Sequence, residues 1–114
     1  MNRTLAAMVV VALSLTAPRV VSAQDARVER GMKVYVDQKC AMCHAIGGKG
    51  NVKGALDDVG RRLEPDLIRG WIVNPADMTK KTKAERKPPM RAYPNLAKED
   101  LDALVAYMVG LKKE

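Results

Sequence analysis

Two thiols and one imidazole lie within five consecutive residues, at Cys40, Cys43 and His44. The gap of two residues between the thiols lets a single helical turn present both sulfurs to one edge of a planar ring. The next residue can then place its imidazole under the centre of that ring, where it can ligate iron. This order is the covalent attachment signature of c-type haem, in which each thiol adds to one vinyl group. His44 is the only histidine of the chain, so an iron with a protein imidazole ligand must use it.

Three other uses of two cysteines at this spacing agree less well with the rest of the chain. A thioredoxin-like redox motif follows a strand in an α/β chain, and the sequence before Cys40 predicts no strand. A zinc site needs further cysteine or histidine ligands, and none remain. A disulfide across two residues closes so short a loop that it adds little to folding. A thiol protein without haem stays open as a less favoured alternative.

The N-terminal residues have the pattern of a secretory signal peptide. Arg3 gives a short positive region, residues 5–15 are almost entirely apolar, and Val21-Ser22-Ala23 offers small residues to a signal peptidase. The apolar run is too short to span a membrane, which favours cleavage over a retained membrane anchor. We predict a signal peptide over residues 1–23, cleavage near Ala23/Gln24, one mature domain over residues 24–114, and a periplasmic location.

Charge and composition narrow the choice of partners. The chain carries a net charge of +7, and loss of residues 1–23 removes two arginines and no acid, which leaves 18 basic and 13 acidic residues, or +5. This excess favours acidic protein partners and does not indicate nucleic acid. A short chain with few aromatic residues and no phenylalanine is poor in core material, and a buried porphyrin would supply the missing apolar volume.

Apolar periodicity predicts a helix at each end of the mature chain. Residues 26–38 carry one apolar face at Val28, Met32 and Tyr35, with Asp25 as the expected N-cap. Residues 98–112 carry a longer apolar stripe, formed by Leu101, Leu104, Val105, Met108 and Leu111. Between them, five glycines in residues 45–63 predict a loop.

A third helix is predicted to open at Glu64-Pro65-Asp66 and to end at Asn74-Pro75. Its expected buried side is formed by Leu67, Ile68, Trp71 and Ile72. The indole N–H of Trp71 needs a partner when it is buried, so Trp71 is a candidate contact for a haem propionate, with core packing as the alternative.

Residues 76–91 carry the densest charge, which predicts a solvated loop. Within this loop, Pro88-Pro89 stiffens the backbone just before Met90. Methionine fills cores through its flexibility, so a methionine in a rigid loop suits an axial ligand of iron better than a core position. Met78 is the principal rival. The basic side chains of this region are candidates for docking an acidic redox partner, and they are Lys80, Lys81, Lys83, Arg86, Lys87 and Arg91.

With these features together, the sequence resembles the class I cytochromes c over nearly all of the mature chain. The most specific parts are Cys40-x-x-Cys43-His44, Met90-x-Ala92-Tyr93-Pro94-x-Leu96 and Leu101-x-Ala103-Leu104-x-Ala106-Tyr107. The resemblance implies an all-α fold that wraps one covalently attached haem c, with His44 and Met90 as the two axial ligands. It also implies close crossing of the first and last helices, at Gly31 and Tyr35 on one side and Leu104 or Tyr107 on the other.

The chain departs from this family in three places. Arg91 follows Met90 where the family commonly has proline, and Ala97 stands near the cap of the last helix where Ser or Thr is usual. The usual Gly-Pro after the haem motif is replaced by Gly54-Ala55-Leu56. The carbonyl that orients His44, which a metal-bound histidine normally has, is therefore not identifiable from the sequence.

A six-coordinate iron with histidine and methionine ligands has no open position for substrate, so we predict an electron carrier and not an enzyme. It would serve as a soluble carrier or as the cytochrome subunit of a redox enzyme, with no stable membrane insertion after cleavage. The alternative is a haem protein with an open distal site that binds ligands or acts as a peroxidase.

Overall fold

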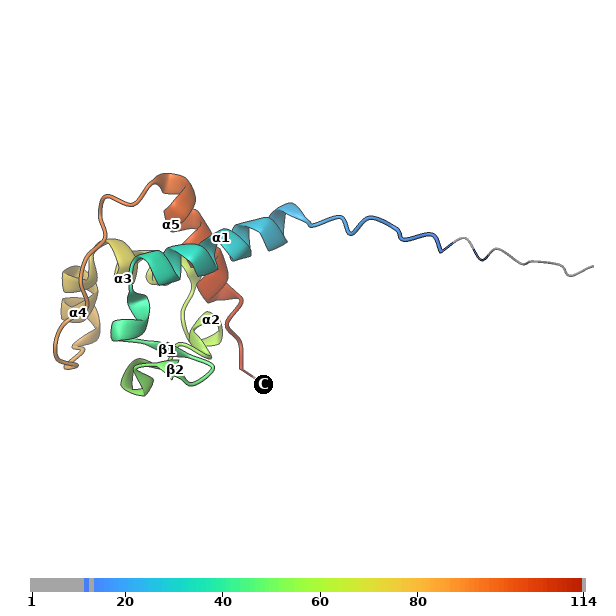
Figure 1. The fold of residues 1–114 in the computed structure, drawn as a ribbon. Coiled ribbons are helices and arrows are strands. Elements are labelled where there is room, and N and C mark those ends of the chain that lie inside the picture. Colours follow the sequence, from blue (N-terminus) through green and yellow to red (C-terminus); the bar gives the residue numbers. More distant parts are fainter. Residues whose placement is uncertain (1–11, 13, 114) are drawn as a thin grey trace, which may run out of the picture.

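The computed structural model describes residues 12 and 14–113, so about half of the predicted signal peptide lies outside the described residues. The elements are almost all helical, as predicted, and they close around one core (Figure 1). In chain order they are α1 (Ala23–Asp37), η1 (Cys40–Met42), β1 (Ala45–Ile46), β2 (Lys49–Gly50), η2 (Val52–Gly54), α2 (Val59–Arg62), α3 (Pro65–Val73), α4 (Pro75–Thr82) and α5 (Lys98–Val109).

The first helix starts earlier than expected and buries a different face. In the uncleaved chain the Ser22 hydroxyl accepts a hydrogen bond from the Asp25 backbone N–H at 3.1 Å, so Ser22 and not Asp25 is the N-cap there. The buried residues of α1 are Gly31, Val34 and Tyr35, whereas Met32 is 48% exposed. The prediction that Met32 lies on the buried face was wrong. The face that packs against α5 is formed by Gly31 and by the residues three and four positions later, Val34 and Tyr35.

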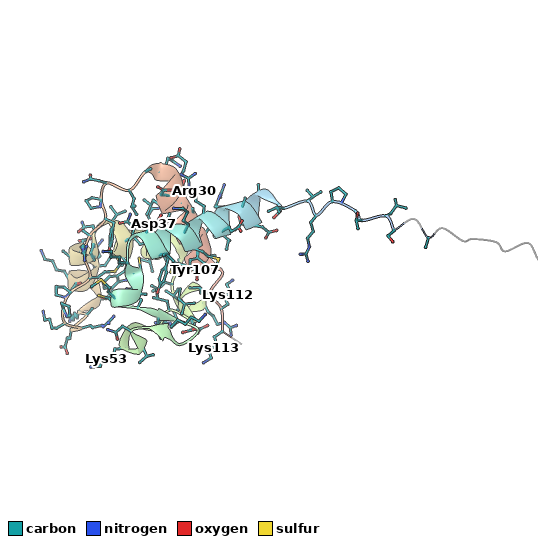
Figure 2. All side chains as sticks on the ribbon, viewed as in Figure 1. Arg30, Asp37, Lys53, Tyr107, Lys112 and Lys113 are labelled. Atoms are coloured by element: carbon teal, nitrogen blue, oxygen red, sulfur yellow. The ribbon has the colours of Figure 1, made fainter. Side chains whose placement is uncertain are left out.

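The close crossing of α1 and α5 is confirmed, and it depends on Gly31. A Cβ atom placed on Gly31 would lie 2.2 Å from the Ala103 carbonyl oxygen and 2.7 Å from the Tyr107 Cβ atom. The rings of Tyr35 and Tyr107 meet edge to face, with centroids 6.0 Å apart. Figure 2 labels Arg30 and Tyr107 in this region, where Arg30 forms an ion pair of 2.8 Å with Asp100.

The first part of the basic segment, residues 76–82, belongs to the helix α4 and not to the solvated loop that its charge predicted, whereas residues 83–91 form a largely exposed loop as predicted. Asn74 ends α3 and caps α4 by accepting from the Asp77 N–H, and Pro75 is the first residue of α4. Met78 is buried and its sulfur lies against Gly70 of α3, so α4 packs on α3. Leu67 on α3 is 44% exposed, in contrast to its expected burial.

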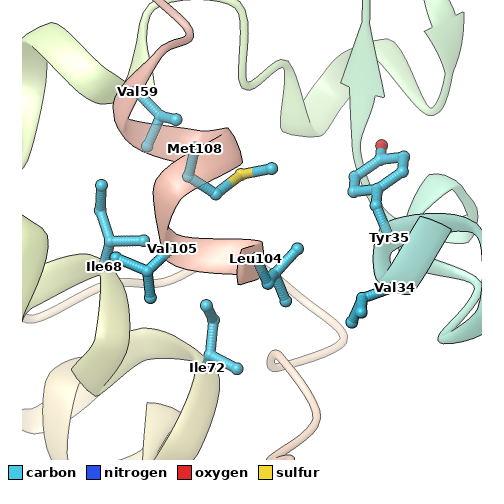
Figure 3. Packing of buried hydrophobic residues seen from close by; sticks show 8 residues of the cluster. All are labelled: Val34, Tyr35, Val59, Ile68, Ile72, Leu104, Val105 and Met108. Atoms are coloured by element: carbon cyan, nitrogen blue, oxygen red, sulfur yellow. The ribbon is translucent and has the colours of Figure 1, made fainter. Parts of the chain in front are cut away.

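The stretch 45–63 is also more ordered than the predicted loop, with a two-residue antiparallel pair between β1 and β2 and two short helical turns. The last helix ends at Val109 and leaves Leu111 beyond it. As expected, its cap residue Ala97 makes no side-chain hydrogen bond. Figure 3 shows the core around α5, and its members are Val34, Tyr35, Val59, Ile68, Ile72, Leu104, Val105 and Met108.

Candidate functional site

One cavity of about 490 Å³ brings the predicted site residues together. Cys40, Cys43, His44 and Met90 all line it, although Met90 is 46 residues further along the chain than His44. Trp71 lines it as well. The rest of the wall is largely apolar and includes Tyr35, Leu56, Val59, Ile68, Ile72, Leu104 and Met108. The size falls in the range of cofactor sites, about 300 to 1,000 Å³.

The chemistry of the cavity wall fits a haem group. Cys40 and Cys43 are free thiols, so both are able to form thioether bonds. Burial raises the pKa of the Cys40 thiol, as expected for a sulfur in an apolar wall. The hydroxyl of Tyr35 is buried and finds no hydrogen-bond partner among the described residues. A cavity with apolar walls, an unpartnered hydroxyl and a row of ligating side chains suits a large ring with a few polar groups.

The backbone of the haem motif is fixed from behind by β2 and the residue after it. Lys39 adopts a left-handed conformation with φ of 56°, and the chain then turns through η1. The Asn51 N–H donates to the carbonyls of both Ala41 and His44, at 3.1 and 2.9 Å. Gly50 makes this approach feasible, because its φ is +112° and a Cβ there would lie 2.2 Å from the His44 oxygen.

The structure identifies the carbonyl that orients His44. The Nδ1 atom of His44 lies 2.9 Å from the Gly54 carbonyl oxygen. Since a carbonyl only accepts, Nδ1 carries the proton, and Nε2 is left with its lone pair for a metal. Burial lowers the pKa of His44, the Gly54 hydrogen bond opposes this effect, and the Arg86 charge adds to it. A lowered pKa keeps the imidazole neutral, which is the form that ligates.

Of the methionines in the described residues, Met90 and Met108 line the cavity. Met78 lies against Gly70 of α3 and is not part of the cavity wall, so of Met78 and Met90 only Met90 lines the cavity. Met42 is 66% exposed. Met108 belongs to the core of α5, as its place on the apolar stripe predicted.

The predicted docking residues are all exposed, but they are not equivalent. Lys81 forms an ion pair of 2.8 Å with Asp77 on α4. Arg86 donates from Nη2 to the Cys43 carbonyl oxygen at 2.6 Å and lines the cavity. Exposed positions are also occupied by Lys80, Lys83, Lys87 and Arg91.

Sequence reasoning missed several residues of the site. The cavity wall includes Lys53 and Arg62, two exposed residues of a stretch whose glycines predicted only a loop. Tyr93 lines the cavity too, and its N–H donates to the Ile72 carbonyl at 2.8 Å. Gly54 was visible only as a replacement for the usual Gly-Pro, because a hydrogen bond from its carbonyl depends on the three-dimensional path of the loop.

A mostly helical domain with a cavity lined by a Cys-x-x-Cys-His motif defines a c-type haem protein. The chain belongs to the cytochrome c family, since the sequence model described as "Cytochrome c" matches residues 28–112. A curated relative is "Cytochrome c oxidase subunit 2" of Alkalihalophilus pseudofirmus, 33% identical over 92 residues. The match covers 73% of this chain and 25% of the relative, so the chain spans about a quarter of the relative's length.

A search of solved structures gave no significant match. Within residues 12 and 14–113, no helix is long and apolar enough to cross a membrane. Family membership identifies a haem electron-transfer protein whose cofactor is haem c.

Proposed function

We propose that this chain carries one electron at a time on a single haem c, with His44 and Met90 as the axial ligands of iron. The observation that carries this proposal is that His44 and Met90 line one cavity while Met78 lies outside it. The thiols of Cys40 and Cys43 would hold the haem covalently. When bound, haem supplies the Fe(III)/Fe(II) couple.

The protein's own part in this function is to keep the ligand set fixed. The Gly54 carbonyl sets the tautomer and the ring orientation of His44. Pro88 and Pro89 restrict the backbone that precedes Met90. The apolar wall from α3 and α5 excludes water, so little rearrangement accompanies a change of charge. Trp71 lines the cavity, and we propose that its indole N–H donates to a haem propionate.

The absorption spectrum of protein made in a host that attaches c-type haem tests the ligand assignment. We expect a low-spin spectrum with the weak far-red sulfur-to-iron band, and loss of that band in Met90→Leu. The matched controls are Met108→Leu, which changes the other methionine of the cavity, and Met78→Leu, which changes one outside it. Both should keep the band. Retention of the band in Met90→Leu would refute the assignment.

A haem spectrum that lacks the band in the unchanged protein would support the alternative function. The distal side would then be open, and ligand binding or peroxidase activity would become the leading account. Tight binding of carbon monoxide by the ferrous protein would be the accompanying sign, because the gas needs a free coordination position.

The location and the N-terminus form a second part of the proposal. We infer a periplasmic protein whose signal peptide is removed after Ala23. N-terminal sequencing of the exported protein should begin at Gln24. A first residue other than Gln24 would contradict the cleavage site, and a protein retained in the cytoplasm would contradict the location.

The exposed basic side chains near Met90 are proposed to steer acidic redox partners. Charge reversal at Lys87 and Arg91 should slow electron transfer strongly at low salt and weakly at high salt, because screening removes steering. Lys112→Glu with Lys113→Glu is the matched control, since these lysines lie at the C-terminal end, away from α4 (Figures 1 and 2). Equal slowing by both pairs would contradict a docking surface near Met90.

A second candidate function is a fixed cytochrome subunit of an oxidase. The relative is named as an oxidase subunit and is much longer than this chain, which favours a cytochrome unit working inside a larger assembly. Gel filtration of native material distinguishes the two. Elution at the size of the single chain supports a carrier, and elution with other subunits supports the oxidase role.

A further inference from the structure

The segment that carries Met90 has few hydrogen bonds to the rest of the described protein, although Met90 itself packs against the core. It runs between α4 and α5, and its ends are held by hydrogen bonds from the Ala84 N–H to the Thr79 carbonyl at 3.2 Å and from the Tyr93 N–H to the Ile72 carbonyl at 2.8 Å. Within the described part of the chain, residues 85–92 make one hydrogen bond, from Arg86 to Cys43. Segments with so few bonds open at low free-energy cost unless something holds them.

The contact made by Arg86 reaches the opposite side of the site. Its Nη2 atom donates to the Cys43 carbonyl oxygen at 2.6 Å, directly before His44 in the chain. The guanidinium also lies over Gly54, since a Cβ on Gly54 would be 2.3 Å from Nη1 of Arg86 and 2.1 Å from the Cys43 oxygen. Gly54 in turn accepts the Nδ1–H of His44. Arg86 therefore touches both backbone segments that position the imidazole.

We propose that Arg86 is a positioning residue that fastens the Met90 loop to the backbone of the haem motif. The Arg86 guanidinium then attaches the Met90 loop to Cys43. It also packs against Gly54, whose carbonyl orients His44. The effect of this contact on iron ligation rests on the proposed ligands His44 and Met90. The contact between the two protein segments does not depend on that proposal.

Arginine suits this role better than lysine. The planar guanidinium presents several N–H donors in a fixed arrangement, so it can donate to Cys43 while its other nitrogen lies against Gly54. A hydrogen bond from a charged donor is also about twice as strong as a neutral one. The two prolines that follow, Pro88 and Pro89, lack backbone N–H groups and cannot provide a substitute bond.

Limited trypsin digestion of the haem-loaded protein tests the fastening directly. The measured quantity is the rate of cleavage after Arg91, which tracks the population of the open loop. We expect Arg86→Met to raise this rate about tenfold, as loss of a charge-assisted hydrogen bond predicts. Lys87→Met is the matched control, because it removes the same charge from the neighbouring exposed residue, and it should change the rate less than about twofold.

A second variant keeps the proposal open to refutation. Arg86→Lys retains the charge and one donor, so its cleavage rate should lie between those of the unchanged protein and Arg86→Met. It also serves if Arg86→Met fails to fold, as judged by circular dichroism. Equal cleavage rates in Arg86→Met and Lys87→Met, or in Arg86→Lys and the unchanged protein, would overturn the proposal.

Carbon monoxide affinity of the ferrous protein separates this proposal from the proposed function. If Met90 ligates, Arg86→Met should bind carbon monoxide about tenfold more tightly than Lys87→Met, because the open population rises. An unchanged affinity together with faster cleavage would support the fastening and refute Met90 as the distal ligand. An unchanged cleavage rate with an intact sulfur-to-iron band would refute the fastening alone.

Discussion

Gly31→Ala is predicted to destabilise the protein although alanine is the better helix former. The added Cβ would lie 2.2 Å from the Ala103 carbonyl oxygen, whereas ordinary contacts begin at 3.4 Å. The neighbouring atom belongs to the backbone of α5, so it can move only if the two helices separate, by about 1 Å along the line between the two atoms. No side-chain rotation relieves this overlap.

The expected size of the effect follows from two opposing terms. Overpacking against a rigid neighbour costs up to about 3 kcal/mol. The substitution of glycine by alanine inside a helix returns about 1 kcal/mol. The net expectation is a loss of about 2 kcal/mol in the free energy of unfolding, with the crossing of α1 and α5 as its source.

Guanidinium unfolding of the haem-loaded protein measures this loss. Gly70→Ala is the matched control, since it gives the same gain in helix propensity. Its new Cβ would meet the Met78 sulfur at 3.1 Å, and a thioether end can move. We expect Gly70→Ala to cost at least 1 kcal/mol less than Gly31→Ala. Equal free energies of unfolding for Gly31→Ala and the unchanged protein would refute the close-crossing argument.

Three further predictions concern other sites. Gly50→Ala should lower the free energy of unfolding by more than about 2 kcal/mol, and with it the yield of haem-loaded protein. The reason is that the φ of +112° and the 2.2 Å approach to the His44 oxygen both oppose a side chain. A normal yield would contradict this prediction. Burial raises the pKa of Tyr35 to about 12, so the stability that its protonated form gives the folded state is complete below about pH 10 and is lost as the pH rises toward 12. Tyr35→Phe should therefore flatten the alkaline decline of the melting temperature. An equally steep decline in Tyr35→Phe would exclude Tyr35 as its source. Hydrogen bonds from Lys98 and Arg69 lower the pKa of Asp102, so the contribution of Asp102 to folding stability is present above about pH 4 and disappears as the pH falls further. Asp102→Asn should reduce the loss of stability in acid. An unchanged dependence of stability on acid pH would contradict the role of these ion pairs.

The sequence predicted best those parts in which chemistry or periodicity is local. Cys40, Cys43 and His44 are recognised by spacing alone, and the structure places them with Met90 in one cavity. The bounds of α3 and the start of α5 follow from Pro65 and from the regular apolar stripe.

The α4 helix was missed because net charge was given more weight than capping. Asn74, Pro75 and Asp77 form an N-terminal signal, and lysines occupy the last turn, so the sequence contained the information. Met78 was misjudged for the same reason, since a residue in a helix can be buried where a residue in a solvated loop cannot.

The hydrogen bonds of Gly54 and Arg86 could not be predicted from the sequence, for a different reason. His44 and Gly54 are ten residues apart, and Cys43 and Arg86 are 43 residues apart. Such pairs follow from the path of the whole chain and not from a local pattern.

The cavity bears on how this protein is assembled. Ile68, Ile72, Leu104 and Met108 belong both to the hydrophobic core and to the cavity wall. The cavity of about 490 Å³ is partly open, so without a cofactor these apolar residues would lie against water. A bound ring would cover them, and a group that binds only the folded chain stabilises the folded state. Cofactor insertion and chain folding would therefore be thermodynamically linked.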